Sequence, residues 1–359
     1  MKYRLLDMVV CPHCQGRLIC AAFSMVAREV LEGVLTCGCG RWYPIIGGVP
    51  RLLPDSLMAD FLLDNIDFLE KHKGNIPKSL APSDGEDEYI NLKRRTSSSF
   101  GFEWGTFSEV IEEYEAIFLG HISPVEESFF RHKLVLDAGC GAGRYSYYAA
   151  RFGAEVIAVD FSKAVEAAYR NNRHFSKVHV VQGDIYKLPL RKEFDYCFCI
   201  GVLHHLPEPE KGFEKLVGLL RPNSPISIWT YGRRHNLLAL YIYEPIKRVS
   251  TRMPHKMLYY LCYLPASILE LFNILYKVFK SFRLSRRFAG LIPFRHYSHF
   301  PFRTKLNDAF DVFSAPSAKY YTEQEIRDWF EAAGLKDIDV QYRKLDGVEK
   351  GIKGFGINS

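Results

Sequence analysis

The chain has 359 residues, of which 48% are hydrophobic and 25% are charged, and its formal net charge is +6. This length supports a full hydrophobic core and more than one domain, and the composition is that of an ordinary globular protein. Such a mild positive charge does not by itself indicate binding to nucleic acid, and we expect no DNA partner. The first residues lack the uncharged core and cleavage site of a signal peptide, so we expect a cytoplasmic location.

Two close pairs of cysteines lie near the start of the chain, Cys11-Pro-His-Cys14 and Cys37-Gly-Cys39. Four thiolates on two tight turns can complete a tetrahedral Zn²⁺ site. The odd total of nine cysteines also suits a reducing compartment better than a disulfide framework. We therefore expect a structural zinc ion on these four residues, with Cys20 as the spare ligand if Cys39 does not reach. The alternative is a hairpin domain whose thiols hold no metal.

Residues 55–99 alternate short apolar patches with charged, Pro-rich and Ser-rich stretches, which predicts a linker with one helix over 58–71. The next segment, 100–107, contains four aromatic residues and precedes a predicted helix over 108–118. Such a segment either packs as an aromatic staple in the core or closes a ligand site as a lid, and both interpretations stay open.

A glycine-rich turn follows the apolar strand that ends near Asp137. Gly139, Gly141 and Gly143 allow positive φ angles and let a ligand approach where a Cβ atom would collide. The first N–H groups of the next helix point into the same space. A dinucleotide fingerprint needs glycine at its sixth position, where this chain has Arg144, so the spacing disfavours a pyrophosphate ligand.

The two following strands, over 155–160 and 178–184, also end in acids. Because ligands of open α/β sheets bind at the carboxyl ends of the strands, we expect Asp137, Asp160 and Asp184 to share one crevice. Three acids suit a nucleoside with a positive charge better than a phosphate. A fourth strand over 194–200 ends in Gly201 and, shortly after, a histidine pair that faces the same crevice.

These motifs resemble those of the class I S-adenosylmethionine-dependent methyltransferases with a type-11 methyltransferase domain. The matching stretches are Val135-Leu-Asp-Ala-Gly-Cys-Gly-Ala-Gly-Arg144, Val159-Asp-Phe-Ser162, Gln182-Gly-Asp-Ile185 and Phe194 to His205. The resemblance implies that Asp137 and the glycine loop hold the methionine moiety, Asp160 the ribose, and Asp184 with Ile185 the adenine. The implied cofactor-binding set is Asp137, Gly139, Gly141, Gly143, Asp160, Phe161, Asp184, Ile185 and Gly201.

The resemblance also places His204 and His205 near the sulfonium methyl group or the acceptor, where they line the pocket or act as a base. Because that methyl group is already electrophilic, the protein has mainly to hold an acceptor in line behind it. An oxygen acceptor of high pKa needs a base, whereas a soft or anionic acceptor does not.

The N-terminal pattern up to Leu53 resembles a small zinc-ribbon family whose free-standing members act as activator subunits of methyltransferases. We therefore predict an α/β protein with a Rossmann-like, seven-stranded methyltransferase sheet covered by helices on both faces. A small β-rich zinc-ribbon-like domain and a helical insertion complete it. The predicted parts are a zinc-ribbon-like domain over 1–54, a linker with a helix over 55–99, a methyltransferase domain over 100–231 and 321–359, and an insertion over 232–320. Thr322 and Glu325 predict a capping box, and two terminal strands predict a closing hairpin.

The insertion contains a predicted helix over 266–282 with a narrow polar stripe and a broad apolar face. Basic residues flank it, namely Lys247, Arg248, Arg252 and Lys256 before it and Arg283, Arg286 and Arg287 after it. Three interpretations stay open: a lid packed on the domain, an interfacial helix on anionic lipid, and a membrane span interrupted by Pro265 and Glu270. Residues 257–287 are therefore the candidate for peripheral contact with the inner membrane face.

The resemblance implies transfer of a methyl group from S-adenosylmethionine by in-line displacement. It extends to enzymes of surface-glycan and lipid-linked pathways, and the apolar, base-flanked insertion suits a small or lipid- or glycan-linked acceptor. An rRNA or tRNA acceptor is the alternative, although the basic residues form no dense patch. A non-catalytic cofactor-binding scaffold or activator is a third hypothesis, against which the three intact acids argue.

Overall fold

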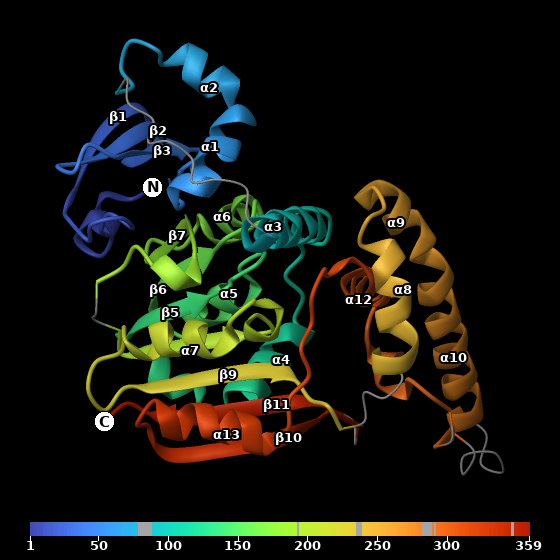
Figure 1. The fold of residues 1–359 in the computed structure, drawn as a ribbon. Coiled ribbons are helices and arrows are strands. Elements are labelled where there is room, and N and C mark those ends of the chain that lie inside the picture. Colours follow the sequence, from blue (N-terminus) through green and yellow to red (C-terminus); the bar gives the residue numbers. More distant parts are fainter. Residues whose placement is uncertain (78–87, 192–193, 235–238, 282–288, 291, 346–347) are drawn as a thin grey trace.

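The computed structural model describes residues 1–77, 88–191, 194–234, 239–281, 289–290, 292–345 and 348–359. Arg283, Arg286 and Arg287, which the sequence places after the apolar helix, lie outside these residues. In the described part of the chain, one sheet of eleven strands has the order β1-β2-β3-β4-β7-β6-β5-β8-β9-β11-β10 (Figure 1).

Seven consecutive strands of this sheet confirm the predicted methyltransferase architecture. They are β7 (Val178–Gly183), β6 (Glu155–Asp160), β5 (Leu134–Ala138), β8 (Tyr196–Ile200), β9 (Pro225–Tyr231), β11 (Val348–Ile357) and β10 (Lys336–Leu345). The first five are parallel, and the terminal hairpin of β10 and β11 adds to β9 in the antiparallel sense. The strand order reverses direction at β5, which is where an open α/β sheet forms its ligand crevice.

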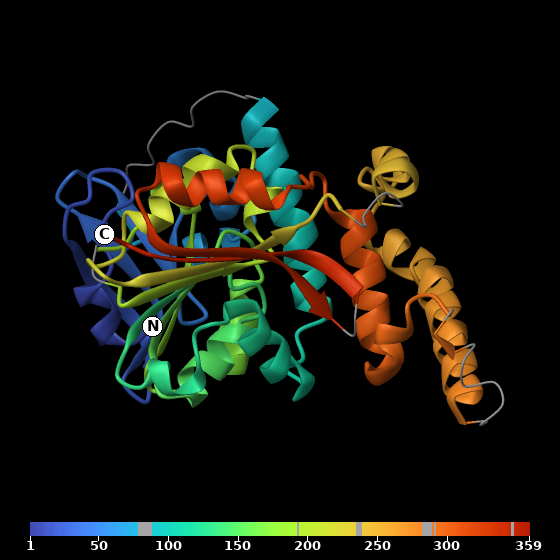
Figure 2. The same ribbon diagram turned by 90° about the horizontal axis from the view of Figure 1, so that it is seen from below.

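Helices cover both faces of the sheet (Figure 2), and alternate residues of the parallel strands pack against them. The helices of one face are α4 (Glu113–Ile122), α5 (Arg144–Arg151) and α6 (Val165–Asn172), and those of the other are α7 (Pro209–Val217) and α13 (Glu323–Ala332). Val135 belongs to the cluster under the first group and Leu136 to the cluster under the second. The continuous apolar runs of these strands follow from this burial on both faces. Thr322 and Glu325 form the predicted capping box at the start of α13.

The N-terminal strands extend this sheet instead of forming a separate one. They are β1 (Leu18–Val26), β2 (Glu29–Cys37), β3 (Trp42–Ile46) and β4 (Val49–Leu52), an antiparallel meander after the 3₁₀ turn η1 (Tyr3–Asp7). Strand β4 pairs in parallel with β7, with Arg51 opposite Gln182 and Leu52 opposite Gly183. The predicted β-rich domain is present, and its continuity with the larger sheet is a finding of the structure.

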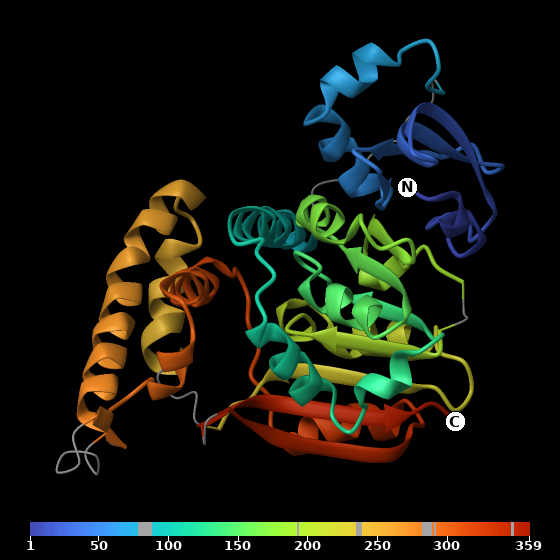
Figure 3. The same ribbon diagram turned by 180° about the vertical axis from the view of Figure 1, so that it is seen from behind.

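The segment predicted as a linker with one helix differs in the structure. Two short helices, α1 (Asp55–Leu63) and α2 (Ile66–Lys71), replace the single helix over 58–71, because the backbone of Asn65 is not helical. A longer helix, α3 (Glu88–Thr106), continues from the expected linker through the aromatic segment. Seen from behind, α3 lies between the sheet and the helices of the insertion (Figure 3).

The insertion is helical, as predicted. Its described elements are η5 (Ala239–Tyr243), α8 (Glu244–Ser250), α9 (His255–Leu261), α10 (Tyr263–Ser281), η6 (Arg295–His299) and α12 (Phe302–Ser314). A separate small core joins α9 and α10 to α12 through Leu258, Ala266 and Phe310. Helix α10 stands at the outside of the molecule, beyond α12 as seen from the sheet (Figure 1).

Candidate functional site

A cavity of about 620 Å³ opens at the carboxyl ends of the parallel strands, which is the size of a typical small-molecule site. Its floor is the glycine loop and the ends of β6, β7 and β8, one wall is α3, and its roof comes from the insertion. The predicted residues that line it are Gly139, Gly141, Asp160, Phe161, Asp184, Ile185, Gly201 and His205. Asp137, Gly143 and His204 lie behind this lining.

The glycine loop between β5 and α5 needs its glycines for two reasons. The φ angles of Gly139, Gly141 and Gly143 are +82°, +52° and +72°, which side chains rarely tolerate. A Cβ atom on Gly139 would lie 2.3 Å from a methyl group of Val202, and one on Gly143 would lie 2.5 Å from the Asn172 amide nitrogen. The loop therefore exposes its backbone at the cavity floor. Val202 and Asn172 pack so closely against it that side chains at Gly139 and Gly143 would not fit.

Asp160 ties the end of β6 to the glycine loop. Its Oδ2 accepts a hydrogen bond from the Gly141 N–H at 2.9 Å, and its Oδ1 accepts from the N–H and hydroxyl of Ser162 at 2.8 and 2.7 Å. Burial raises the pKa of Asp160, while these donors oppose the shift. The carboxylate is thus held in one orientation at the cavity edge.

Asp137 is enclosed beneath the cavity floor. It is 2% exposed, its Oδ2 accepts a hydrogen bond from the Ser146 hydroxyl at 2.5 Å, and burial raises its pKa to about 7. The sequence argument placed it against the cofactor. In the structure its carboxylate contacts Ser146 in the first turn of α5, and Asp137 lies behind the residues that line the cavity.

Asp184, after β7, is paired with a cation that sequence reasoning missed. Lys93 of α3 donates to its Oδ2 at 2.6 Å, and the Tyr186 N–H donates to its Oδ1 at 3.1 Å. Lys93 lies in the segment interpreted as a linker, where nothing in the local pattern marked it as a site residue. The ion pair holds α3 over this end of the crevice, where Phe100 and Trp104 of the aromatic segment line the cavity while Phe102 and Phe107 pack in the small core with α12.

The two predicted histidines have different environments on the 3₁₀ turn η4 (Leu203–His205). His205 lines the cavity, and its Nδ1 lies 2.7 Å from the Ser317 carbonyl oxygen, so Nδ1 carries the proton. Burial lowers the pKa of His205, which favours the neutral ring with a lone pair on Nε2. His204 is fully buried against Tyr231, at 3.9 Å between ring centroids, and neither of its ring nitrogens has a hydrogen-bond partner among the described residues. Of these two histidines, His205 is the one that lines the cavity and can exchange a proton with a ligand.

Three further acids line the cavity on its insertion side, and sequence reasoning named none of them. Asp311 accepts a hydrogen bond from the Tyr231 hydroxyl at 2.8 Å, and Asp308 accepts one from the Tyr297 hydroxyl at 2.5 Å. Glu103 of α3 is 1% exposed, and burial together with Asp311 raises its pKa well above the usual value. These residues come from segments far apart in the sequence, so no local motif predicts that they meet in one cavity.

Cations also line the cavity, namely Lys93, Arg144, Lys247 and Arg343. The Arg144 guanidinium lies 4.6 Å from the ring centroids of both Trp104 and Tyr114, and it forms no hydrogen bond among the described residues. Such stacking is favourable for a weakly hydrated guanidinium. Together with the acids, these cations give an otherwise aromatic cavity a few placed charges.

The four cysteines predicted to bind zinc come together, whereas Cys20 lies apart on β1. The sulfur atoms of Cys11, Cys14, Cys37 and Cys39 all lie within 4.8 Å of one another. The Sγ–Sγ distances are 3.8 Å for Cys11 and Cys39 and 3.4 Å for Cys14 and Cys37. Tetrahedral Zn²⁺ with Zn–S bonds of about 2.3 Å separates its sulfur atoms by about 3.8 Å. The cluster therefore fits a structural zinc site, and its four protein ligands leave no open position for chemistry.

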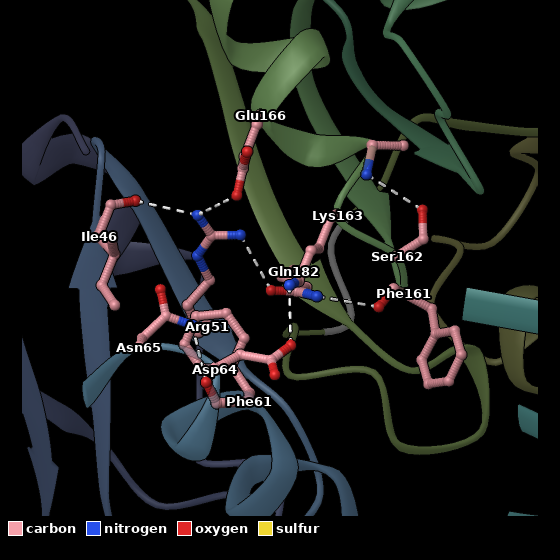
Figure 4. Close-up of polar contacts among 11 residues, drawn as sticks. Ile46, Arg51, Phe61, Asp64, Asn65, Phe161, Ser162, Lys163, Glu166 and Gln182 are labelled. Carbon is pink, nitrogen blue, oxygen red and sulfur yellow. Dashed lines mark hydrogen bonds and ion pairs between the residues drawn. The ribbon is translucent and has the colours of Figure 1, made fainter. Parts of the chain in front are cut away.

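A buried arginine connects the N-terminal strands to the cavity (Figure 4). Arg51 is 1% exposed, and its guanidinium donates to Gln182 Oε1 at 3.0 Å and to the Ile46 carbonyl oxygen at 3.2 Å. The amide of Gln182 in turn donates to the Phe161 carbonyl oxygen at 3.0 Å. Phe161 follows Asp160 and lines the cavity, so this relay runs from β4 to the predicted ribose site.

Comparison with known families identifies the two parts of the chain. Residues 136–228 match the family described as "Methyltransferase domain", and residues 2–48 match the family described as "Trm112p-like protein". These matches confirm the predicted resemblance, so the chain contains a methyltransferase domain preceded by a Trm112p-like region.

Individual relatives match over limited stretches. The mitochondrial ubiquinone biosynthesis O-methyltransferase of Schizosaccharomyces pombe is 29% identical over 160 residues, which cover 41% of this chain and 57% of that protein. The tRNA U34 carboxymethyltransferase of Psychromonas ingrahamii is 35% identical over 96 residues, 25% of this chain and 28% of that protein. A solved structure of Burkholderia thailandensis 1,6-didemethyltoxoflavin-N1-methyltransferase aligns with a TM-score of 0.45 at 17% identity, over 78% of this chain and 92% of that one.

Proposed function

We propose that this protein is an S-adenosylmethionine-dependent methyltransferase. The observation that carries the proposal is the position of the cavity. It lies at the strand ends of the methyltransferase domain, over two glycines without Cβ atoms and beside the carboxylates of Asp160 and Asp184. When bound, S-adenosylmethionine supplies an electrophilic methyl group, so the protein needs to supply mainly position.

The residues present fit this cofactor. Asp160 is held by backbone and hydroxyl donors on one side and borders the cavity, as an acceptor for ribose hydroxyls must. Ile185 and Phe161 offer apolar surface for an adenine ring, and Gly139 and Gly141 leave room for the methionine moiety. Asp137 supports the loop from below and does not need direct contact.

We assign His205 the role of proton acceptor for a protic acceptor group. The Ser317 carbonyl fixes the tautomer with the proton on Nδ1, and the lowered pKa keeps Nε2 unprotonated near neutral pH. The proton of an acceptor hydroxyl or amine would then be held at Nε2. His204 packs against Tyr231 and supports this turn.

For the acceptor we propose a small or lipid-linked amphiphile. The roof and walls of the cavity are rich in aromatic rings, among them Phe100, Trp229, Phe294 and Phe300. The carboxylates of Asp308 and Asp311 disfavour a phosphate-rich ligand at the same end. The relative from Schizosaccharomyces pombe is, by its name, an O-methyltransferase of ubiquinone biosynthesis.

RNA is the second candidate acceptor. The observations that favour it are the tRNA-modifying relatives and the Trm112p-like match. The acids at the cavity roof argue against it, since RNA binding draws on cations along the backbone path.

Calorimetric titration with S-adenosylmethionine tests the cofactor assignment. We expect binding by the wild type, an affinity at least about tenfold lower in Asp160→Asn because two charge-assisted contacts are lost, and no change in the exposed control Asp67→Asn. If the wild type does not bind S-adenosylmethionine, the cofactor assignment is wrong and the cavity has another ligand. Transfer of a labelled methyl group to a lipid extract or to RNA then separates the two acceptor classes.

A further inference from the structure

The outer surface of helices α9 and α10 is apolar over its whole length. Tyr260, Leu264 and Leu271 are 71%, 70% and 55% exposed. The other large apolar residues exposed on these helices are Met257, Leu261, Tyr263, Ile268, Ile274, Leu275, Val278 and Phe279. Most of them recur at spacings of three and four residues, so they share one face of the helix. We call this surface, formed by these eleven residues, the outer face.

The inner side of the same helices carries Leu258 and Ala266 of the small core together with polar residues. Asn273 is 1% exposed, and its amide oxygen and nitrogen have no hydrogen-bond partner among the described residues. Glu270 pairs with the buried Lys305 of α12 at 2.6 Å. A helix of a water-soluble protein turns its apolar stripe to the core and its polar stripe to solvent. Here the larger apolar stripe is exposed, which suits contact with a non-aqueous environment.

The charges around the outer face are basic. Between residues 244 and 281 the only acids are Glu244 and Glu270, and each is paired with a lysine. The exposed cations of this stretch are Arg248, Arg252, Lys256, Lys277 and Lys280. A broad apolar face in a segment whose exposed charges are all basic is the composition of a helix that lies in the headgroup region of an anionic bilayer.

Two other occupants fit less well. A second copy would bring identical basic margins together, and the outer face is wider than the two-position seam of a coiled coil. A membrane span is possible by length and composition, because His255–Ser281 has a mean hydropathy of 1.4 over its most apolar window. However, α10 packs along α12 through the Glu270–Lys305 pair, so a span would carry the charged residues of α12 into the hydrocarbon.

We propose that the outer face docks the protein onto an anionic lipid surface. The helices that carry it also pack on α12, whose Thr304, Asp308 and Asp311 line the cavity, so docking would hold the cavity close to the bilayer. An amphiphilic acceptor could then reach the cavity without leaving the lipid entirely. This last point rests on the proposed function, whereas lipid docking itself does not.

The test is co-flotation of the full-length protein with vesicles of phosphatidylcholine and phosphatidylglycerol in equal parts, compared with phosphatidylcholine alone. We expect wild-type protein to prefer the anionic vesicles. The double variant Leu264→Glu/Leu271→Glu should bind them about 100-fold more weakly, at about tenfold per lost apolar side chain. Arg248→Glu/Lys256→Glu should lose the preference for the anionic vesicles, at several-fold per charge.

A matched control is available in the N-terminal region. Ile19 and Leu63 are 67% and 69% exposed and lie outside the insertion, so Ile19→Glu/Leu63→Glu introduces the same chemistry elsewhere. This control should float like the wild type. The inference is overturned if wild-type protein fails to bind the anionic vesicles, or if Leu264→Glu/Leu271→Glu binds as well as the control. It is also overturned if that variant instead dissociates a dimer that forms without lipid. Calorimetry with S-adenosylmethionine on the same samples reports the proposed function separately.

Discussion

Arg51 offers a direct test of how the N-terminal strands support the methyltransferase domain. We consider Arg51→Met, which keeps much of the side-chain volume and removes the guanidinium. Two acceptors, Gln182 Oε1 and the Ile46 carbonyl oxygen, would lose their donor. An orphaned buried acceptor costs about 1–3 kcal/mol, and burial of the apolar methionine offsets part of this. We expect the free energy of unfolding to fall by about 2–4 kcal/mol.

The same substitution should weaken cofactor binding without touching the cavity. Gln182 holds the Phe161 carbonyl, and loss of its own partner frees the amide to move. A cost of about 1 kcal/mol at this loop corresponds to about a fivefold rise in the dissociation constant for S-adenosylmethionine. Urea unfolding of zinc-loaded protein and calorimetric titration measure the two effects.

Glu166→Gln is the control for this prediction. Glu166 forms an ion pair with Arg51 at 3.5 Å, but its side chain is 51% exposed, so loss of its charge should cost less than about 1 kcal/mol. The relay from β4 to the cavity would be refuted if Arg51→Met proved as stable as Glu166→Gln and bound the cofactor as tightly as the wild type.

Three other predictions concern the metal and the histidines. Elemental analysis should find about one zinc per chain, and Cys37→Ser should lower both zinc content and the thermal stability of the N-terminal strands; fully folded protein without metal would contradict this. Burial lowers the pKa of His204 well below 6.5, so the neutral ring stabilises the folded protein above pH 6.5 and this stabilisation is lost as the pH falls below it. His204→Phe should therefore unfold at lower pH than the wild type in acid titrations followed by fluorescence. If a protic acceptor is methylated, turnover should rise with pH to a plateau as His205 loses its proton. His205→Gln should reduce kcat by about 10²-fold or more with little change in cofactor affinity. An unchanged pH profile in this variant would exclude His205 as the base.

Local patterns determined much of the fold. The bounds of β6 coincide with the predicted strand over 155–160, because a run of β-branched and apolar residues flanked by breakers leaves few alternatives. The glycine loop was predictable because backbone conformation at those positions excludes most side chains. The capping box at Thr322 was predictable because its hydrogen bonds join residues three apart.

The sheet was predictable in kind, and so was the convergence of Asp160 and Asp184 on one crevice, because parallel strands in this topology end on the same side. The zinc cluster was predictable because each pair of cysteines shares a turn. The partners of these acids could not be predicted from the sequence. The contacts of Asp137 with Ser146 and of Asp184 with Lys93 depend on how the helices pack on the sheet.

Only the tertiary structure decided the remaining features. The pairing of β4 with β7 joins residues that are far apart in the sequence, and backbone hydrogen bonds carry no sequence signature of their partner. Glu103, Asp308 and Asp311 meet in the cavity only because α3 and the insertion fold over it. The sequence predicted a polar stripe and an apolar stripe on α10. Packing against α12 decided that the apolar stripe faces outward, because the buried Lys305 requires the carboxylate of Glu270.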